Sequence, residues 1–242
     1  MGEVMGVNYN PKIISNDLVL VADAKNLKSV TSSTTVITNA AGGSNNFTGT
    51  GLNVIQDSVA GSVFSLESSN DYGADVSPVI PKHSFSVICW IKYQTGNASN
   101  YTPIWKLNTS DNPSFGYYCI MDTRLPSVEY IHAYIKDYTT NSWAATDILS
   151  QGEWEGSTTW FCIGLTMAQS SEYKTYVNGK LEATVSAGGR DFSSYGDIDR
   201  VEIGSTFGTV GARLGHFAVY KKPLSEAEVK QNFEALRGRF GI

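Results

Sequence analysis

Three carboxylates stand close together in the stretch GDIDRVEIGS, residues 196–205: Asp197, Asp199 and Glu202. A retaining glycosidase needs two carboxyl groups about 5–5.5 Å apart, one as the nucleophile and one as the proton donor. In a strand, however, successive side chains point to opposite faces. Asp197 and Asp199 then share one face and Glu202 lies on the other, unless a bulge intervenes. We therefore expect an ordinary strand in which Arg200 pairs either with the neighbourhood of Asp199 or with Glu202, and not a catalytic site.

The composition of the chain favours a globular β-protein and argues against two kinds of partner. The 242 residues are 41% hydrophobic and only 17% charged, with 13 Tyr, 10 Phe and 23 Gly. Aromatic residues suit pleated, half-buried strands, and Gly marks turns. A net charge of −5 without a basic cluster argues against nucleic acid. No apolar run in the chain approaches the roughly 20 residues of a membrane span. The N-terminal residues also lack the basic segment followed by an apolar run that marks a secretory signal. We expect neither a membrane partner nor a secretory signal.

The three cysteines, Cys89, Cys119 and Cys162, each lie among apolar neighbours. An odd number of thiols cannot all pair within one chain. Free, buried thiols, which behave as small core residues, are favoured over one disulfide with a leftover cysteine. This choice agrees with folding in a reducing cytoplasm.

Strand patterns recur along the whole chain. The run FSVICWIKY, residues 85–93, is apolar on both faces and predicts a central, doubly covered strand. In EYKTYVNGKLEATVS, residues 172–186, two alternating runs flank Asn178 and Gly179, which predict a hairpin with a type I′ turn. The polar stretch 28–51 reads as a long loop.

A single helix is predicted near the end of the chain, at about residues 225–237. Ser225 followed by Glu228 forms a capping box, and Gly238 offers a C-cap. Many strands followed by one short helix predict an all-β fold, a two-sheet antiparallel jelly-roll sandwich closed by that helix. We divide the chain into an N-terminal arm, residues 1–16, and one jelly-roll domain, residues 17–242.

Several segments in one order resemble the concanavalin A-like, laminin-G-like jelly-roll family. They are NDLVLVADAKN, SVFSLESSNDYGADVS, FSVICWIKY, WFCIGLTMAQSSEYKTYVNGKLEATVS and RLGHFAVYKKPLSEAEVKQNFEALRGRFGI, which together span residues 16–242. The closing QNFEALRGRFGI resembles the ends of structural proteins of tailed bacteriophages, in particular cyanophage-type myoviruses. The resemblance implies a non-enzymatic virion protein, most simply a decoration protein on the outside of the capsid.

The resemblance also implies what to expect of partners and place. The partners would be the major capsid protein or other virion proteins, together with further copies of the chain, plausibly as a trimer. The protein would sit on the virion surface after synthesis in the cytoplasm of the host bacterium. The N-terminal arm, with Asn8, Tyr9 and Pro11, is our candidate for docking on a neighbour.

Two rival functions follow from the same family. Glycosidases of this fold use a strand motif of the form E-x-D-x-(x)-E, and here Asp197 stands where the first Glu is required. Aspartate is one methylene shorter, which counts against hydrolysis. The other rival is a tail-fibre or baseplate adhesin that binds host surface glycans by stacking sugars on Trp143 and Tyr138.

Calcium is the one cofactor that we consider, because laminin-G-like folds often hold Ca²⁺ through loop carboxylates and carbonyl oxygens. Asp71 and Asp23 are the candidate ligands, although no D-x-D-x-D spacing is present. The competing expectation for Asn70 and Asp71 is that they cap their own turn. The histidines, His83, His132 and His216, are too widely spaced for a zinc site.

Overall fold

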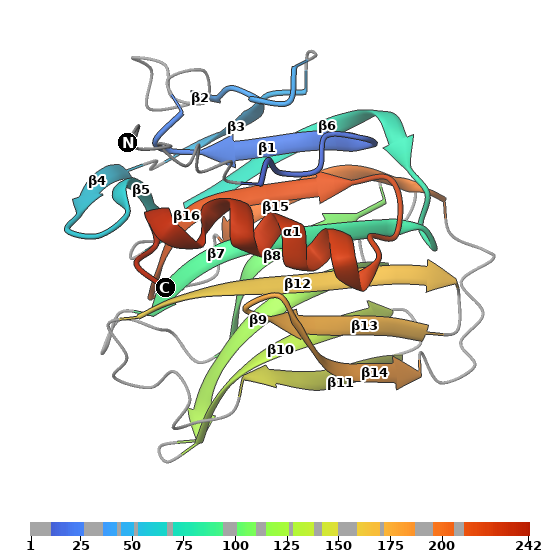
Figure 1. Cartoon of the computed structure of the whole chain (residues 1–242). Helices are drawn as coiled ribbons and strands as arrows, with labels where there is room; N and C mark the ends of the chain where they lie inside the picture. Colours follow the sequence, from blue (N-terminus) through green and yellow to red (C-terminus); the bar gives the residue numbers. More distant parts are fainter. Residues whose placement is uncertain are drawn as a thin grey trace, which may run out of the picture.

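Two eight-stranded antiparallel sheets lie face to face in the computed structural model (Figure 1). The structure describes residues 11–26, 36–42, 45–50, 53–66, 70–93, 101–109, 115–125, 128–137, 142–149, 159–169, 172–186, 196–205 and 211–242. Sheet A runs in the order β14-β13-β12-β7-β16-β5-β4, and β1 also pairs with β16. Sheet B runs in the order β11-β10-β9-β8-β15-β6-β3-β2. The predicted two-sheet sandwich is confirmed.

The strands of sheet A are β1 (Leu18–Asp23), β4 (Asn53–Asp57), β5 (Gly61–Ser65), β7 (Phe85–Tyr93), β12 (Trp160–Gln169), β13 (Glu172–Val177), β14 (Lys180–Ser186) and β16 (Ala212–Tyr220). Those of sheet B are β2 (Val36–Ile37), β3 (Phe47–Thr50), β6 (Asn70–Ile80), β8 (Tyr101–Asn108), β9 (Phe115–Leu125), β10 (Val128–Asp137), β11 (Ser142–Leu149) and β15 (Ile198–Ser205).

Two predictions about loops and turns are wrong. The stretch 28–51 contains β2 and β3, and Asn70 and Asp71 lie inside β6 instead of capping a turn. Both segments form strands because they pair: β3 pairs with β2 and with β6, and Asp71 is opposite Gly204 of β15. Cross-strand partners far away in sequence leave no local signal in runs this short and polar.

The central strand β7 confirms its prediction, because all nine of its residues are buried. It lies between β12 and β16 in sheet A. Its inner face, which includes Cys89, contributes to the core between the two sheets. Its outer face, which includes Trp90, belongs to a second apolar cluster. Sheet A is therefore covered on both faces.

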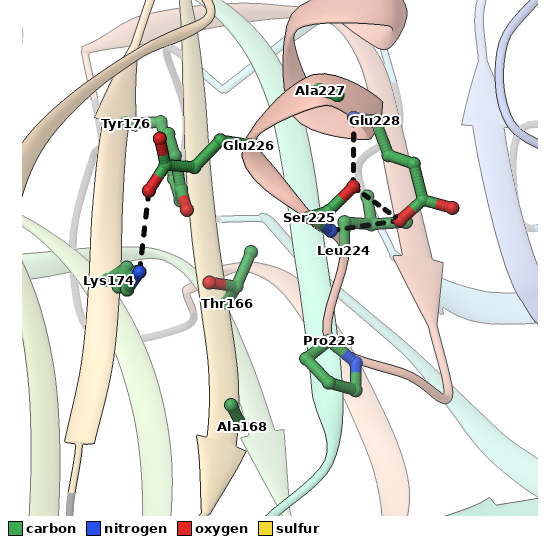
Figure 2. Close-up of a pocket in the computed structure, with 10 residues that line it drawn as sticks. All are labelled: Thr166, Ala168, Lys174, Tyr176, Pro223, Leu224, Ser225, Glu226, Ala227 and Glu228. Atoms are coloured by element: carbon green, nitrogen blue, oxygen red, sulfur yellow. Dashed lines mark hydrogen bonds and ion pairs between the residues drawn. The ribbon is translucent and has the colours of Figure 1, made fainter.

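The cover on the outer face of sheet A is the C-terminal segment. Helix α1 (Glu226–Leu236) lies across this face in Figure 1 and is followed by the 3-10 turn η1 (Arg237–Arg239). Ser225 Oγ accepts the Glu228 N–H and the Glu228 carboxylate accepts the Ser225 N–H, which confirms the capping box (Figure 2). The predicted C-cap at Gly238 is wrong: Gly238 lies in η1, and the positive φ, 75°, occurs at Gly241.

Aromatic stacking fixes the C-terminal segment on sheet A. The Trp90 ring stacks against Phe233 of α1, with centroids 5.6 Å apart, and against Phe240, with centroids 4.2 Å apart. Phe240 lies directly over Gly215 of β16, because a Cβ built on that glycine would be only 2.3 Å from the Phe240 ring. The absent side chain of Gly215 thus provides the space that the ring occupies.

The hairpin of β13 and β14 adopts the predicted turn. Asn178 and Gly179 have φ angles of 49° and 76°, as a type I′ turn requires. The Asn178 side chain accepts the Cys162 N–H at 3.0 Å, and the turn lies under Phe233. The hairpin is thereby tied both to β12 and to the helix.

All three cysteines are free and buried, as predicted. Burial raises the pKa of the Cys89 thiol to about 12 and also raises those of Cys119 and Cys162. These thiols are therefore core residues without thiolate reactivity. In the described part of the chain, no helix has the length and apolar character to cross a membrane.

We predict that Gly215→Ala lowers the free energy of unfolding by about 1–3 kcal/mol, because the new methyl group would overlap the Phe240 ring. Urea unfolding followed by tryptophan fluorescence measures the effect. Gly238→Ala is the matched control, because a Cβ there meets nothing within 4 Å. Equal stability of the two variants would contradict the seating of Phe240 on β16.

Candidate functional site

The three acids that opened the sequence analysis lie at β15. Ile198, Val201 and Ile203 all point into the core between the sheets. Two of these positions are three residues apart, so the strand cannot alternate regularly, and the pairing with β6 shifts between Ile198 and Arg200. This irregularity turns Ile198 into the core, whereas Arg200 and Glu202, two positions apart, share the outer face of sheet B.

Glu202 is held between two cations on that outer face. Its Oε2 atom accepts from Lys106 Nζ of β8 at 2.5 Å, and its Oε1 atom accepts from Arg200 Nε at 2.8 Å. Arg200 also reaches Asp75 of β6, Nη1 to Oδ1, at 3.0 Å. The guanidinium lies over Gly73, where a Cβ would be only 2.3 Å from Nη2. The four charges form a ladder across three strands, and Glu202, one of the two partners expected for Arg200, is among its contacts.

The chemistry available to Glu202 follows from these contacts. Burial raises the pKa of its carboxyl group, but hydrogen bonds from Lys106 and Arg200 outweigh burial and lower the pKa below its usual value. A general acid in glycoside hydrolysis needs the opposite shift. Asp197, exposed at the start of β15, accepts the Lys82 backbone N–H at 3.1 Å. The geometry therefore suits an ion-paired surface better than a nucleophile with a proton donor.

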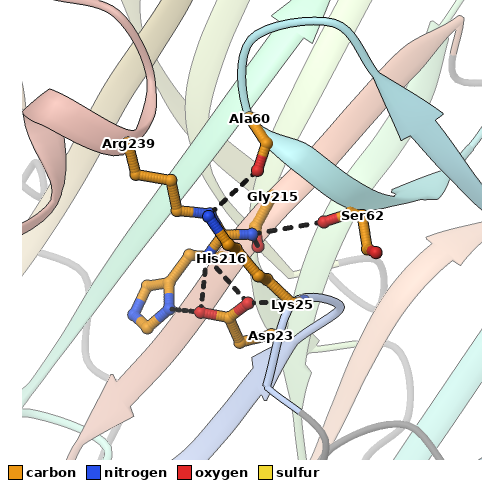
Figure 3. Close-up of polar contacts among 7 residues, drawn as sticks. All are labelled: Asp23, Lys25, Ala60, Ser62, Gly215, His216 and Arg239. Atoms are coloured by element: carbon orange, nitrogen blue, oxygen red, sulfur yellow. Dashed lines mark hydrogen bonds and ion pairs between the residues drawn. The ribbon is translucent and has the colours of Figure 1, made fainter.

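The two candidate calcium ligands lie on different sheets. Asp71 belongs to β6 of sheet B, and its side chain is outside what the structure describes. Asp23 ends β1 of sheet A, where both of its oxygens bind Arg239 Nη1, at 2.8 and 2.7 Å (Figure 3). A guanidinium in that position competes with a bound cation for the same oxygens. In the described residues, no three His, Cys, Asp or Glu side chains are grouped to hold a metal ion. The calcium site stays a prediction.

Asp23 also binds His216 of β16, with Oδ2 at 3.1 Å from Nδ1. Burial raises the pKa of the Asp23 carboxyl group, but the hydrogen bond and charge of His216 and the contacts of Arg239 lower it to about 2. An ionised carboxylate can only accept, so the His216 proton is on Nδ1. Arg239 donates further to the carbonyl oxygens of Ala60, Ser62 and Gly215 (Figure 3). The cluster joins β1, β5, β16 and the C-terminal turn.

The sequence analysis missed this cluster. Asp23 is 193 residues from His216 and 216 residues from Arg239. The sequence does contain a signal: Asp23 ends an apolar strand and Arg239 follows the helix, and a charged group beside apolar residues needs a partner of opposite charge. That the two bind each other is seen only in the structure, where both lie at the outer face of sheet A.

Of the two candidate sugar-binding aromatics, only Trp143 belongs to a described strand. Trp143 is in β11, the last strand of sheet B, opposite Lys136 of β10. Its side chain and the whole of Tyr138 are outside the described residues. Trp90, Trp105 and Trp160 are buried. Stacking on Trp143 and Tyr138 stays a prediction.

Of the candidate docking residues, Asn8 and Tyr9 are outside the described residues, and Pro11 is exposed. Pro11 begins a segment, residues 11–16, that lies against α1. Gln231 Nε2 donates to the Lys12 carbonyl oxygen and Asn232 Oδ1 accepts the Ile14 N–H, both at 2.8 Å. Part of the predicted arm thus contacts the chain's own helix.

Two hollows flank α1. One, of about 590 Å³, lies beside the start of the helix and is crossed by the 3.4 Å ion pair of Lys174 with Glu226 (Figure 2). The other, of about 540 Å³, lies between residues 11–16, β1 and the end of the helix. Its lining residues are Pro11, Lys12, Ile13, Ser15, Leu18, Val21, Asp23, Asn26, Ala40, His216, Ala235 and Leu236.

Comparison with known families identifies the fold. The family model of the concanavalin A-like lectin/glucanases superfamily matches residues 67–230, which is more than half of the chain. The chain belongs to this superfamily. Lectins bind sugars and glucanases cleave them, so membership of the concanavalin A-like superfamily leaves both binding and hydrolysis open. Among curated proteins, none matches this chain in sequence.

Solved structures of similar fold include receptor-binding domains of botulinum neurotoxins. That of neurotoxin D has a TM-score of 0.67 and 17% identity, over 91% of this chain and 53% of the other. The ligand-binding domain of serotype D in complex with N-acetylneuraminic acid has a TM-score of 0.64, 17% identity and coverages of 91% and 51%. Neurotoxin type C, which depends on interaction with two ganglioside molecules to enter cells, has a TM-score of 0.65, 14% identity and coverages of 92% and 52%. This chain spans about half the length of these chains, and at such identities the likeness concerns the fold.

We predict that Asp23→Asn removes about 2 kcal/mol of stability at pH 7. The folded-state pKa of Asp23, about 2, is below the ordinary 3.8, so its contribution is complete above pH 4 and is lost as the pH falls toward 2. Urea unfolding at pH 7, 4, 3 and 2 should show the two proteins converging in acid. Asp75→Asn is the control, because that side chain is 88% exposed in its pair with Arg200. A constant difference across this range would contradict the assignment.

Proposed function

We propose that the protein is a non-enzymatic contact module of a tailed-phage particle, acting as a decoration protein on the outer capsid surface. The observation that carries the non-enzymatic part is the state of Glu202. It is paired with Lys106 and Arg200, and its lowered pKa disfavours proton donation. A surface of balanced, mutually paired charges is suited to contact with another protein.

Support for the virion role comes from the resemblance of the closing residues 231–242 to phage structural proteins. In this chain those residues form the second half of α1 and the turn η1, which lie over the outer face of sheet A. The resemblance therefore concerns the architecture of the domain, and the contacts with the capsid must be made by other surfaces. The segment before β1 and the outer face of sheet B are the candidates, with the major capsid protein as the expected partner.

We predict that deletion of residues 1–10 abolishes attachment to purified capsids of the parent phage while the fold is retained. This deletion spares residues 11–16, which bind α1. Co-sedimentation with capsids and circular dichroism measure the two properties. Lys230→Ala, at an exposed position of α1, is the control and should attach normally. Unimpaired attachment of the deletion variant would eliminate the arm as the anchor.

Hydrolysis is the rival that the acids of β15 raise. We predict that the protein releases no reducing sugar from β-glucans and that Glu202→Gln and Asp199→Asn leave this baseline unchanged. Glu182→Gln, at an exposed position of β14, is the matched control. Measurable hydrolysis that disappears in Glu202→Gln but not in Glu182→Gln would overturn the non-enzymatic proposal.

Glycan binding by a tail-fibre or baseplate adhesin is the second candidate function. It is favoured by the likeness to the neurotoxin domain in complex with N-acetylneuraminic acid. That likeness covers about half of the neurotoxin chain, so the sugar contacts there need not belong to the matched half.

If the protein is such an adhesin, Trp143→Ala and Tyr138→Ala should each weaken binding on a glycan array by about tenfold or more, since truncating a Trp or Tyr that is a hot spot of a binding surface costs about 2 kcal/mol or more. Leu181→Ala is the control, because Leu181 is 41% exposed on β14. A wild-type protein that binds no glycan, including sialylated ones, would remove this candidate.

A further inference from the structure

The segment 11–16, called the strap below, is held by α1 as a separate peptide would be. Its Ile14 N–H donates to Asn232 Oδ1, and its Lys12 carbonyl oxygen accepts from Gln231 Nε2, both at 2.8 Å. Both contacts recognise backbone atoms. Ile14 packs against the apolar cluster beneath the helix. We call the receiving surface, Gln231, Asn232 and the adjoining part of that cluster, the cradle.

The cradle is built to receive an extended chain. Asn232 is 1% exposed, and a buried amide needs a hydrogen-bonding partner. The Ile14 N–H of the strap donates to the Asn232 Oδ1 atom and so provides that partner. The strap fills the space incompletely, however, because the hollow of about 540 Å³ remains between it, β1 and the end of α1. The strap is therefore held by two specific hydrogen bonds and by the packing of Ile14, beside space that it does not fill.

A strained hinge connects the strap to the domain. Ser15, Asn16 and Asp17 are exposed, and Asp17 has a φ of 60°. This left-handed region costs free energy for residues other than glycine, although less for aspartate and asparagine than for other residues. β1 begins at Leu18 and is fixed by its pairing with β16. A short, exposed, strained connection between a rigid strand and a detachable segment is the arrangement that favours exchange between identical chains.

We propose that the strap is exchanged between copies of the protein, so that residues 11–16 of one copy lie in the cradle of a second copy. The cradle contacts are the same in the closed and the exchanged forms. The exchanged form extends the hinge and releases the left-handed conformation of Asp17. Reciprocal exchange gives a dimer, and exchange around a ring gives a larger closed assembly.

The equilibrium between the closed monomer and the exchanged assembly depends on protein concentration, because association costs translational and rotational entropy. Relief of the backbone strain at Asp17 offsets only part of that cost. On a particle surface, neighbouring copies are held close together, and the effective concentration of a tethered strap reaches the millimolar range. This last step rests on the proposed virion function. The exchange itself is a property of the chain and is testable in solution without capsids.

The experiment compares two substitutions at the hinge by sedimentation velocity over a range of protein concentrations. Asp17→Pro cannot adopt a φ of 60° and also makes Asn16 extended, whereas Pro is accepted just before a strand. It should shift the equilibrium about 100-fold toward dimers or closed rings. Asp17→Gly adopts the closed hinge freely and should shift it toward the monomer.

Asn232→Leu, combined with Asp17→Pro, separates strap exchange from other association. It removes the acceptor of the Ile14 N–H, so the assemblies should return to monomers. Folding of each variant is checked by circular dichroism, and deletion of Asn16 replaces Asp17→Pro if that variant does not fold. A folded hinge variant that stays monomeric at about 1 mM, or assemblies that persist with Asn232→Leu, would overturn the proposal. Neither result bears on capsid attachment, which the deletion of residues 1–10 tests separately.

Discussion

The contact of the C-terminal segment with the outer face of sheet A is the interaction on which the architecture depends. That face carries a large apolar surface, with Trp90 and Trp160 at its centre, and would be exposed without a cover. Phe240 stacks on Trp90 and occupies the space over Gly215. Arg239 meanwhile neutralises the carboxylate of Asp23 in the same place. The stacking of Phe240 on Trp90 and the ion pair of Arg239 with Asp23 therefore both hold the C-terminal turn on sheet A.

This closure gives several of the last residues of the chain a role in the fold. Phe233, Leu236, Phe240 and Ile242 pack on the outer face of sheet A, so their identities are set by packing. Function must then reside on surfaces that packing leaves available. The outer face of sheet B, with its ladder from Lys106 to Asp75, is one such surface. The strap before β1 is the other, because it is attached to the helix mainly through backbone atoms.

The irregularity in β15 connects the fold to the class of function. Strict alternation would separate Ile198 from Val201, but both are buried in the core. The bulge takes up the extra residue and turns Ile198 into the core. Arg200 and Glu202, two positions apart, both face outward, where Lys106 of the neighbouring strand completes their pairing. An acidic motif that could be read as catalytic thereby becomes a set of neutralised charges. The superfamily includes lectins and glucanases, and the ion pairs of Glu202 are the observation behind our proposal that this chain is non-enzymatic.

By itself, the sequence determined the elements whose signals are local. The alternation around residues 85–93, the turn at Asn178 and Gly179, and the capping box at Ser225 each depend on neighbours in the chain, and all three are present. The tertiary structure alone decided which distant groups meet. Asp23 binds Arg239 and His216 across some 200 residues, and β3 exists because β6 pairs with it. The physical reason is that hydrogen bonds and ion pairs between remote segments depend on where the sheets bring the chain, and no local pattern of residue types contains that information.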